Sequence, residues 1–218
     1  MRRFFILLLF IPVLLLALES EPSEVVGYVK YEGGVAGYQF VANSMATGYT
    51  MASELGNAIG IANCNSISIW KSDTQGWNTS TYIFGSWNND QAIIEGDVIM
   101  CGMLNPADVY MAGALPALPS YSLEIGYSSV MIPLDRSDIT MASELGDEIG
   151  VGNVNSINTW DADNQVWVTT SYIFGSWNND QPLEIGTPIL LGVSSDYTWP
   201  TTRNSVSLGL TTSKGDTK

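Results

Sequence analysis

The sequence predicts a β-rich (α+β) fold of two tandem homologous modules, each a small antiparallel sheet or sandwich with one short helix. Residues 50–102 are followed, ninety residues later, by a second version at 140–192, and 31 of the 53 aligned positions are identical. A repeat of fixed period indicates one structural unit built twice. Each copy combines alternating apolar residues, which are typical of strands, with one segment of helical spacing.

Each copy is predicted to open with strands, because apolar residues alternate at 27–31, 38–42, 122–125 and 129–133. A hairpin is expected after the helix. If its turn centres on residues 73–74, and on 163–164 in the second copy, Trp70 lies opposite Trp77 and Trp160 lies opposite Trp167. Such cross-strand aromatic pairs stabilise a sheet, so these tryptophans are interpreted first as structural.

The helix is predicted between these strands. Ala52, Leu55 and Ile59 recur at three- and four-residue steps, as do their counterparts ninety residues later. We expect the Thr50 and Thr140 side chains to cap the first turn, where Glu54 and Glu144 place favourable negative charge. Gly60 and Gly150 are expected to end the helices in a left-handed conformation.

The segment YIFGSWNNDQ occurs unchanged at 82–91 and 172–181 and is expected to form a tight turn. A last strand pair is predicted around 92–102 and 182–192, with bends at Gly96 and Gly186. Prolines at 106, 116 and 119 indicate a strand feeding a semi-rigid linker. Module 1 is therefore assigned to residues 24–120, module 2 to 121–202, and a C-terminal tail with one alternating stretch to 203–218.

Residues 1–20 are predicted to be a signal peptide. Arg2 and Arg3 precede an uninterrupted apolar run at 4–18, which is shorter than the roughly 20 residues that a membrane-spanning helix needs. An uncleaved anchor is the alternative. The expected location is secreted, either extracellular or on the cell surface, with no membrane contact beyond this segment.

The charge and composition exclude several classes of function. A formal net charge of −14 disfavours nucleic acid as a partner. The chain has no histidine, so triads and dyads that use it cannot form. Residues 161–165 have calcium-loop spacing, but an acidic hairpin turn explains them, and the first copy has Lys71 at the first position. The sequence predicts no enzyme, no catalytic residue, no cofactor and no metal.

Cys64 and Cys101 are the two cysteines, and both belong to the first copy. Their counterparts in the second copy are Val154 and Leu191, which indicates that the positions are buried. Two interpretations stay open: packed free thiols, or a disulfide formed in an oxidising compartment. Since the second copy lacks both cysteines, the fold is not expected to depend on such a bond.

The repeated decapeptide supplies the candidate ligand-binding residues. Its aromatic ring, amides and carboxylate are suited to a sugar-binding patch. These residues are Trp87, Asn88, Asn89 and Asp90, with Trp177, Asn178, Asn179 and Asp180. The alternative is structural, since Tyr82, Phe84 and Trp87 are also what the core of a small β-module needs.

The order TMASELGxxIG, NSIxxW, QxW and YIFGSWNNDQ resembles tandem modules of uncharacterised secreted and cell-surface bacterial proteins. This resemblance implies an extracellular setting and a structural or adhesive role. The expected function is therefore that of a non-enzymatic, self-associating subunit of a surface layer, filament or matrix, whose partners are further copies or other surface proteins. The alternative is a carbohydrate-binding adhesin that uses the repeated Trp, Asn and Asp side chains to bind polysaccharide.

Overall fold

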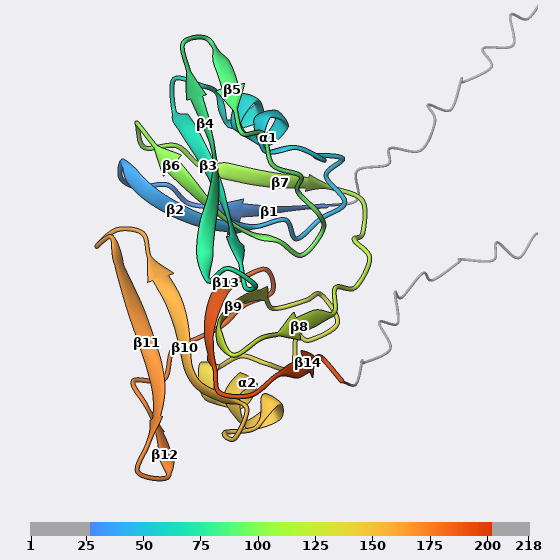
Figure 1. Ribbon diagram of the computed structural model, residues 1–218, viewed down its shortest axis with the longest axis vertical. Coiled ribbons are helices and arrows are strands. Elements are labelled where there is room, and N and C mark those ends of the chain that lie inside the picture. The colour runs from blue at the N-terminus through green and yellow to red at the C-terminus, as the bar shows by residue number, and fades with distance from the viewer. Residues whose placement is uncertain (1–26, 202–218) are drawn as a thin grey trace, which may run out of the picture.

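The computed structural model describes residues 27–201, which form two β-rich modules that follow one another in the chain (Figure 1). Module 1 contains β1 (Gly27–Tyr31), β2 (Gly37–Ala42), α1 (Ala52–Ile59), β3 (Cys64–Lys71), β4 (Gly76–Ile83), β5 (Ser86–Asn88), β6 (Val98–Met103) and β7 (Val109–Gly113). Module 2 contains β8 (Tyr121–Leu123), β9 (Gly126–Met131), α2 (Ala142–Ile149), β10 (Val154–Asp161), β11 (Val166–Ile173), β12 (Ser176–Asn178), β13 (Pro188–Val193) and β14 (Tyr197–Trp199). The predicted fold class is confirmed. The assigned signal peptide at 1–20 and the tail at 203–218 lie outside the described residues.

Each module is built on one five-stranded antiparallel sheet. The strand order is β2-β6-β3-β4-β5 in module 1 and β9-β13-β10-β11-β12 in module 2. A small two-stranded sheet accompanies each, formed by β1 with β7 and by β14 with β8. The two modules therefore repeat the same topology.

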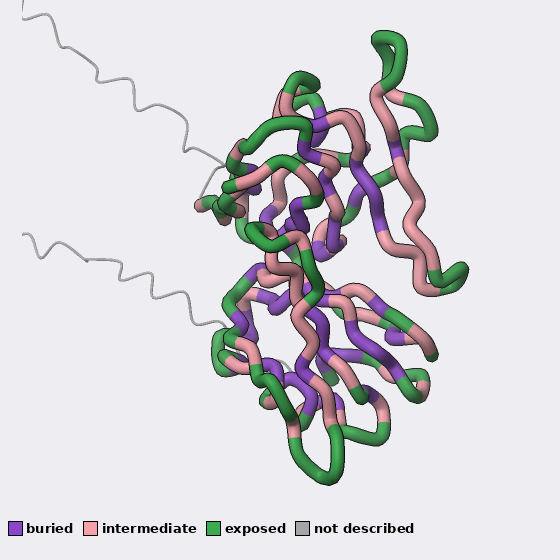
Figure 2. The backbone as a smooth tube through the Cα atoms, turned by 90° about the vertical axis from the view of Figure 1, so that its left-hand side faces the viewer, coloured by how far each residue is buried: buried purple, intermediate pink, exposed green. Residues whose placement is uncertain are grey.

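Each module has a hydrophobic core of its own between its helix and its sheet. In module 1, Leu55 of α1 packs with Ile67, Ile99 and other buried residues. In module 2, Leu145 of α2 packs with Ile157 and Ile189. Figure 2 shows these buried stretches inside both modules. Full burial of one such side chain contributes about 1.5–3 kcal/mol, so these residues are a main source of stability within each module.

The helices begin later than the sequence predicts, and the expected threonine caps are wrong. Each helix starts at Ala52 or Ala142, after a methionine in extended conformation. The main-chain N–H of Thr50 donates to the Glu54 carboxylate at 2.7 Å, so Thr50 lies outside the first turn. The cap comes from Asp90 instead, whose carboxylate accepts the N–H of Ser53 at 2.9 Å. The first turn of the helix is therefore capped by a residue of a distant loop, and not by the adjacent threonine.

The hairpin register is as predicted, because Trp70 pairs with Trp77 and Trp160 with Trp167. In both pairs the ring centroids lie 5.2 Å apart in an edge-to-face arrangement. Of the two strands predicted around residues 92–102, the second forms as β6, and the prediction of the first is wrong. The segment before β6 is a turn, in which Asp97 accepts the N–H of Ile94 and Gly96 adopts a φ of 90°.

The two modules contact each other through reciprocal hydrogen bonds. Gln165 accepts the N–H of Tyr38 at 2.6 Å and donates to its carbonyl at 2.9 Å. Gln75 makes the same two bonds to Tyr127, at 2.6 and 3.0 Å. Each contact that module 2 makes with module 1 is thus matched by the equivalent contact of module 1 with module 2. This is the pattern of a two-fold dimer interface, here within one chain.

A second pair of contacts follows the same two-fold rule. The Tyr31 hydroxyl of β1 donates to the carbonyl of Gly186 at 2.9 Å, and the Tyr121 hydroxyl of β8 donates to the carbonyl of Gly96 at 3.1 Å. Burial raises the pKa of Tyr31, which keeps this hydroxyl protonated and able to donate. The bends at the two glycines are thus where each module meets the other.

Candidate functional site

The repeated decapeptide forms the hairpins β4–β5 and β11–β12, and its tryptophans are turned onto the helices. The indole N–H of Trp87 donates to Asn57 at 2.9 Å, and that of Trp177 donates to Asp147 at 2.8 Å. The ring of Trp87 lies so close to Gly56 that a Cβ built there would be 2.1 Å from a ring carbon. Trp87 and Trp177 therefore fix the base of each hairpin to its helix.

The polar candidates beside these rings are also held within the protein. Asn89 has a φ of 54° and donates to the carbonyl of Thr79 at 3.0 Å. Asp90 accepts the hydroxyl of Ser53 at 2.6 Å in addition to its N–H. Their counterparts do the same: Asn179 donates to Thr169 at 3.1 Å, and Asp180 accepts from Ser143 at 2.8 and 2.6 Å.

Asn88 and Asn178 are exposed, and each lies on the opposite face of its hairpin from the neighbouring tryptophan. Asn88 pairs with Thr81 across the hairpin, whereas Trp87 pairs with Tyr82. Because successive side chains of a strand alternate between faces, Asn88 lies on the sheet face opposite the helix. Asn178 has the same position in module 2. The structure thus does not gather the eight predicted residues into one ligand-facing patch.

The tip of each hairpin presents an exposed phenylalanine. Ile83 pairs with Ser86, so Phe84 and Gly85 form a two-residue loop, with φ values of 52° and 86°. The exposed fraction is 103% for Phe84 and 104% for Phe174. The interpretation of Phe84 as a core residue is wrong. The signal for this position was the Phe-Gly pair between two strand patterns, where a two-residue turn demands positive φ.

This conformation is unfavourable for phenylalanine. Asn, Asp and Gly are the usual residues where both loop positions have positive φ, and a bulky residue there costs of the order of 1–3 kcal/mol. Because the ring is as exposed as in an unfolded chain, it also lacks the stabilisation of about 1.5–3 kcal/mol that burial would contribute. Ile83 and Ile173 are also exposed, at 43% and 45%. Each tip is therefore an apolar knob on a rigid base.

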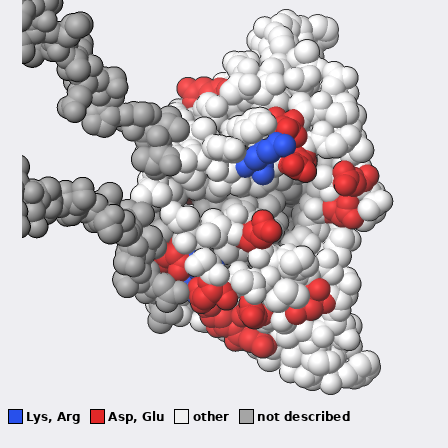
Figure 3. All heavy atoms as spheres, turned by 180° about the vertical axis from the view of Figure 1, so that it is seen from behind, with Lys and Arg blue, Asp and Glu red and all other residues white. Residues whose placement is uncertain are grey.

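The two tips lie at opposite ends of the molecule. The β4–β5 tip is uppermost and the β11–β12 tip lowermost in both Figure 1 and Figure 2. The uppermost and lowermost parts of the face in Figure 3 carry no charged side chains. The geometry is that of a two-ended body with the same apolar element at each end.

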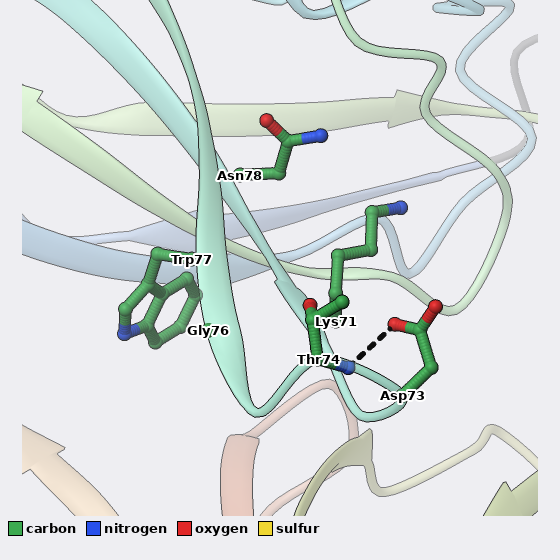
Figure 4. A pocket seen from close by; sticks show the side chains of 6 residues that line it. All are labelled: Lys71, Asp73, Thr74, Gly76, Trp77 and Asn78. Atoms are coloured by element: carbon green, nitrogen blue, oxygen red, sulfur yellow. Dashed lines mark hydrogen bonds between the residues drawn. The ribbon is translucent and has the colours of Figure 1, made fainter.

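A hollow of about 500 Å³ lies beside the turn that joins β3 to β4, at the opposite end of β4 from the Phe84 tip (Figure 4). Lys71, Asp73 and Asn78 lie on one side of β4 and Trp77 on the other. Asp73 accepts the N–H of Thr74 at 2.9 Å, which stabilises the turn. These side chains do not form an acid–base pair or a nucleophile with its base.

Cys64 and Cys101 are buried, free thiols on the neighbouring strands β3 and β6. The Cys64 thiol donates to the carbonyl of Ser66 at 3.3 Å. Contact with Cys64 and complete burial raise the pKa of Cys101 well above its ordinary value. The arrangement is that of packed thiols within the core of module 1.

The charged clusters of residues 27–201 do not form a metal centre. No group of three or more Cys, Asp or Glu side chains there is arranged to hold an ion. Asp161 accepts the N–H and the amide of Asn164, at 2.9 and 2.8 Å, as expected for a turn, and these bonds lower its pKa. Arg136 of module 2 is buried and pairs with Asp138 and Glu148. None of the helices in this part of the chain has the length and apolar character needed to cross a membrane.

Comparison with protein-family models, with curated proteins and with solved structures gives no match.

Proposed function

We propose that this protein is a non-enzymatic extracellular subunit of a surface layer, filament or matrix, and that the Phe84 and Phe174 tips are its contacts with neighbouring subunits. One observation carries the proposal. Identical apolar knobs stand fully exposed at both ends of the molecule, in a conformation that costs free energy. A contact that buries each ring would contribute about 1.5–3 kcal/mol, which offsets the cost of the backbone conformation.

The interface between the modules supports growth through the tips. Its reciprocal contacts are a two-fold arrangement, which closes on itself and offers no further surface for adding subunits. Contacts that extend the assembly therefore use other surfaces. The two tips point away from this interface and from each other (Figure 1).

The adhesin alternative gains no support at Trp87 and Trp177. Both rings rest on a helix glycine, and both indole N–H groups have partners within the module. A ring held in this way stabilises the hairpin whether or not a sugar is present.

The test is the double substitution Phe84→Asn and Phe174→Asn in the mature protein. Because Asn-Gly is preferred in a two-residue hairpin loop of positive φ, the variant should unfold at the same or a higher urea concentration than the wild type. Sedimentation velocity and electron microscopy should show regular polymers of the wild type and only monomers of the variant.

The matched control is Tyr28→Ser, which removes a ring that is 66% exposed on β1 and away from the tips. This variant should assemble as the wild type does. A wild-type protein that stays monomeric at every accessible concentration, or a double variant that polymerises normally, would refute the proposal.

A further inference from the structure

Aromatic side chains from both modules meet where the modules face each other, and they do not fill the space between them. The ring of Phe40 on β2 lies 4.7 Å from that of Trp167, 5.1 Å from Trp160 and 5.5 Å from Trp77. Two hollows, of about 430 and 380 Å³, flank this cluster. Trp167 lines both and is 38% exposed. We call these hollows the inter-module cleft.

Two indole N–H groups in this cleft lack a partner in the protein. Of the seven tryptophans, all within residues 27–201, five donate to a protein oxygen: Trp70, Trp87, Trp160, Trp177 and Trp199. In the described part of the chain, Trp77 and Trp167 have no such bond. Both line the larger hollow. At these equivalent positions, therefore, neither indole N–H would have to give up a bond within the protein in order to donate to a bound molecule.

The cleft is uncharged, although the protein as a whole is strongly acidic. No Asp, Glu, Lys or Arg lines either hollow. The polar groups there are neutral: the Asn158 amide donates to the carbonyl of Leu190 at 2.7 Å, and the Thr169 hydroxyl donates to Asn158 at 2.7 Å. The oxygen of Thr169 keeps capacity to accept a further bond. A ligand matched to these walls is uncharged and combines apolar faces with a few hydrogen-bonding groups.

Neighbouring positions continue this polar character along the sheet. The register places Phe40, Met100, Ser68 and Thr79 in one row across module 1. Ser68 and Thr79 share a hydrogen bond of 2.9 Å. Ser68 is buried, so of this pair only Thr79 is partly exposed. An aromatic wall next to such a hydroxyl group suits a sugar ring, which has an apolar C–H face and polar edges.

We propose that the inter-module cleft binds a neutral oligosaccharide chain, with sugar units on either side of Trp167. The indole rings of Trp77 and Trp167 pack against sugar faces, and their N–H groups donate to sugar oxygens. This site is separate from the decapeptide residues and from the hairpin tips. It does not depend on the assembly function proposed above.

The test is titration of the full mature protein with uncharged hexasaccharides, namely cellohexaose, xylohexaose, mannohexaose and maltohexaose, by calorimetry and tryptophan fluorescence. At least one should bind. The variant Trp167→Phe keeps a ring but loses the donor, and should weaken binding by about 3- to 10-fold, as the loss of one neutral hydrogen bond predicts. The variant Trp167→Ala should weaken it further.

Trp177→Phe is the matched control, because its N–H donates to Asp147 on the helix instead of facing the cleft. It should bind as the wild type does, even though loss of the Asp147 bond lowers its unfolding midpoint. Circular dichroism must show that each variant is folded under the conditions of the titration. The Phe84→Asn, Phe174→Asn variant should also bind normally, which separates this site from assembly.

Three results would overturn the inference. One is the absence of binding to all four hexasaccharides at millimolar concentration. Another is equal affinity of the wild type and a double Trp77→Phe, Trp167→Phe variant. The third is preferential binding of a polyproline peptide, which would show that the aromatic walls recognise protein.

Discussion

Replacing Gly56 with alanine should destabilise module 1, although alanine is the better helix former. Gly56 lies in the interior of α1, where the exchange alone would stabilise by about 1 kcal/mol. The new Cβ would lie 2.1 and 2.3 Å from two carbons of the Trp87 ring. Carbon atoms pack at about 3.5–4.0 Å, so the ring has to move.

The Trp87 ring has little room to move. Its N–H is bound to Asn57 at 2.9 Å, and Tyr82 lies against it with centroids 5.7 Å apart. Overpacking of this kind costs about 1–3 kcal/mol, and loss of the Asn57 bond adds about 0.5–1.5 kcal/mol. After the gain in helix propensity, the expected net loss is about 2 kcal/mol. Gly146→Ala should behave alike, because its Cβ would meet Trp177 at 2.1 Å.

Urea unfolding followed by circular dichroism measures this loss. Gly152→Ala is the control, since a Cβ there meets nothing within 4 Å and its backbone is unstrained. The control should unfold as the wild type does, within about 0.5 kcal/mol. If Gly56→Ala instead proved as stable as the control or more so, Trp87 would not be fixed on the helix. The inference that the hairpin has a rigid base would then be wrong.

Three further predictions concern charges and thiols. Main-chain N–H donors, that of Thr50 foremost, hold the pKa of Glu54 below its ordinary value of 4.5, and the Thr140 N–H does the same for Glu144. A lowered folded pKa means that the stabilisation is complete above the unfolded value and is lost as the pH falls through the folded one. Urea midpoints should therefore drop below pH 4.5, and less steeply in Glu54→Gln, Glu144→Gln; an equal slope in that variant would contradict the assignment. Arg136→Met should cost roughly 3 kcal/mol in urea unfolding, because Glu148 loses the guanidinium that neutralises it; a variant of wild-type stability would show that the pair is dispensable. A thiol-reactive dye should label no cysteine in the native protein and both Cys64 and Cys101 in denaturant without reductant, whereas no labelling in denaturant would reveal a disulfide.

Sequence patterns predicted the features that depend on neighbours within one strand or hairpin. Trp70 faces Trp77 because alternation and turn length together fix the register of two adjacent strands. The cap of α1 escaped prediction because Asp90, which provides it, is 37 residues from Ser53. The residues next to Thr50 in the sequence therefore do not predict that contact.

The candidate site escaped prediction for two other reasons. Phe84 was assigned to the core because apolar residues are usually buried, and this rule fails where a turn carries the ring outward. The inter-module cleft depends on how two modules pack, since Phe40 of one module meets Trp160 and Trp167 of the other. Periodicity within a module contains no information about its orientation relative to the next.

The reciprocal pairing of the modules has a consequence for how the protein can diverge. In a dimer of identical chains, every substitution enters both faces at once, so a change that suits one side must be tolerated on the other. Here one polypeptide supplies both faces, and each can vary alone: Phe40 faces the partner module where Ser129 stands at the matching strand position. The two halves of this chain therefore resemble the subunits of a heterodimer, because a substitution in one half leaves the matching position of the other half unchanged.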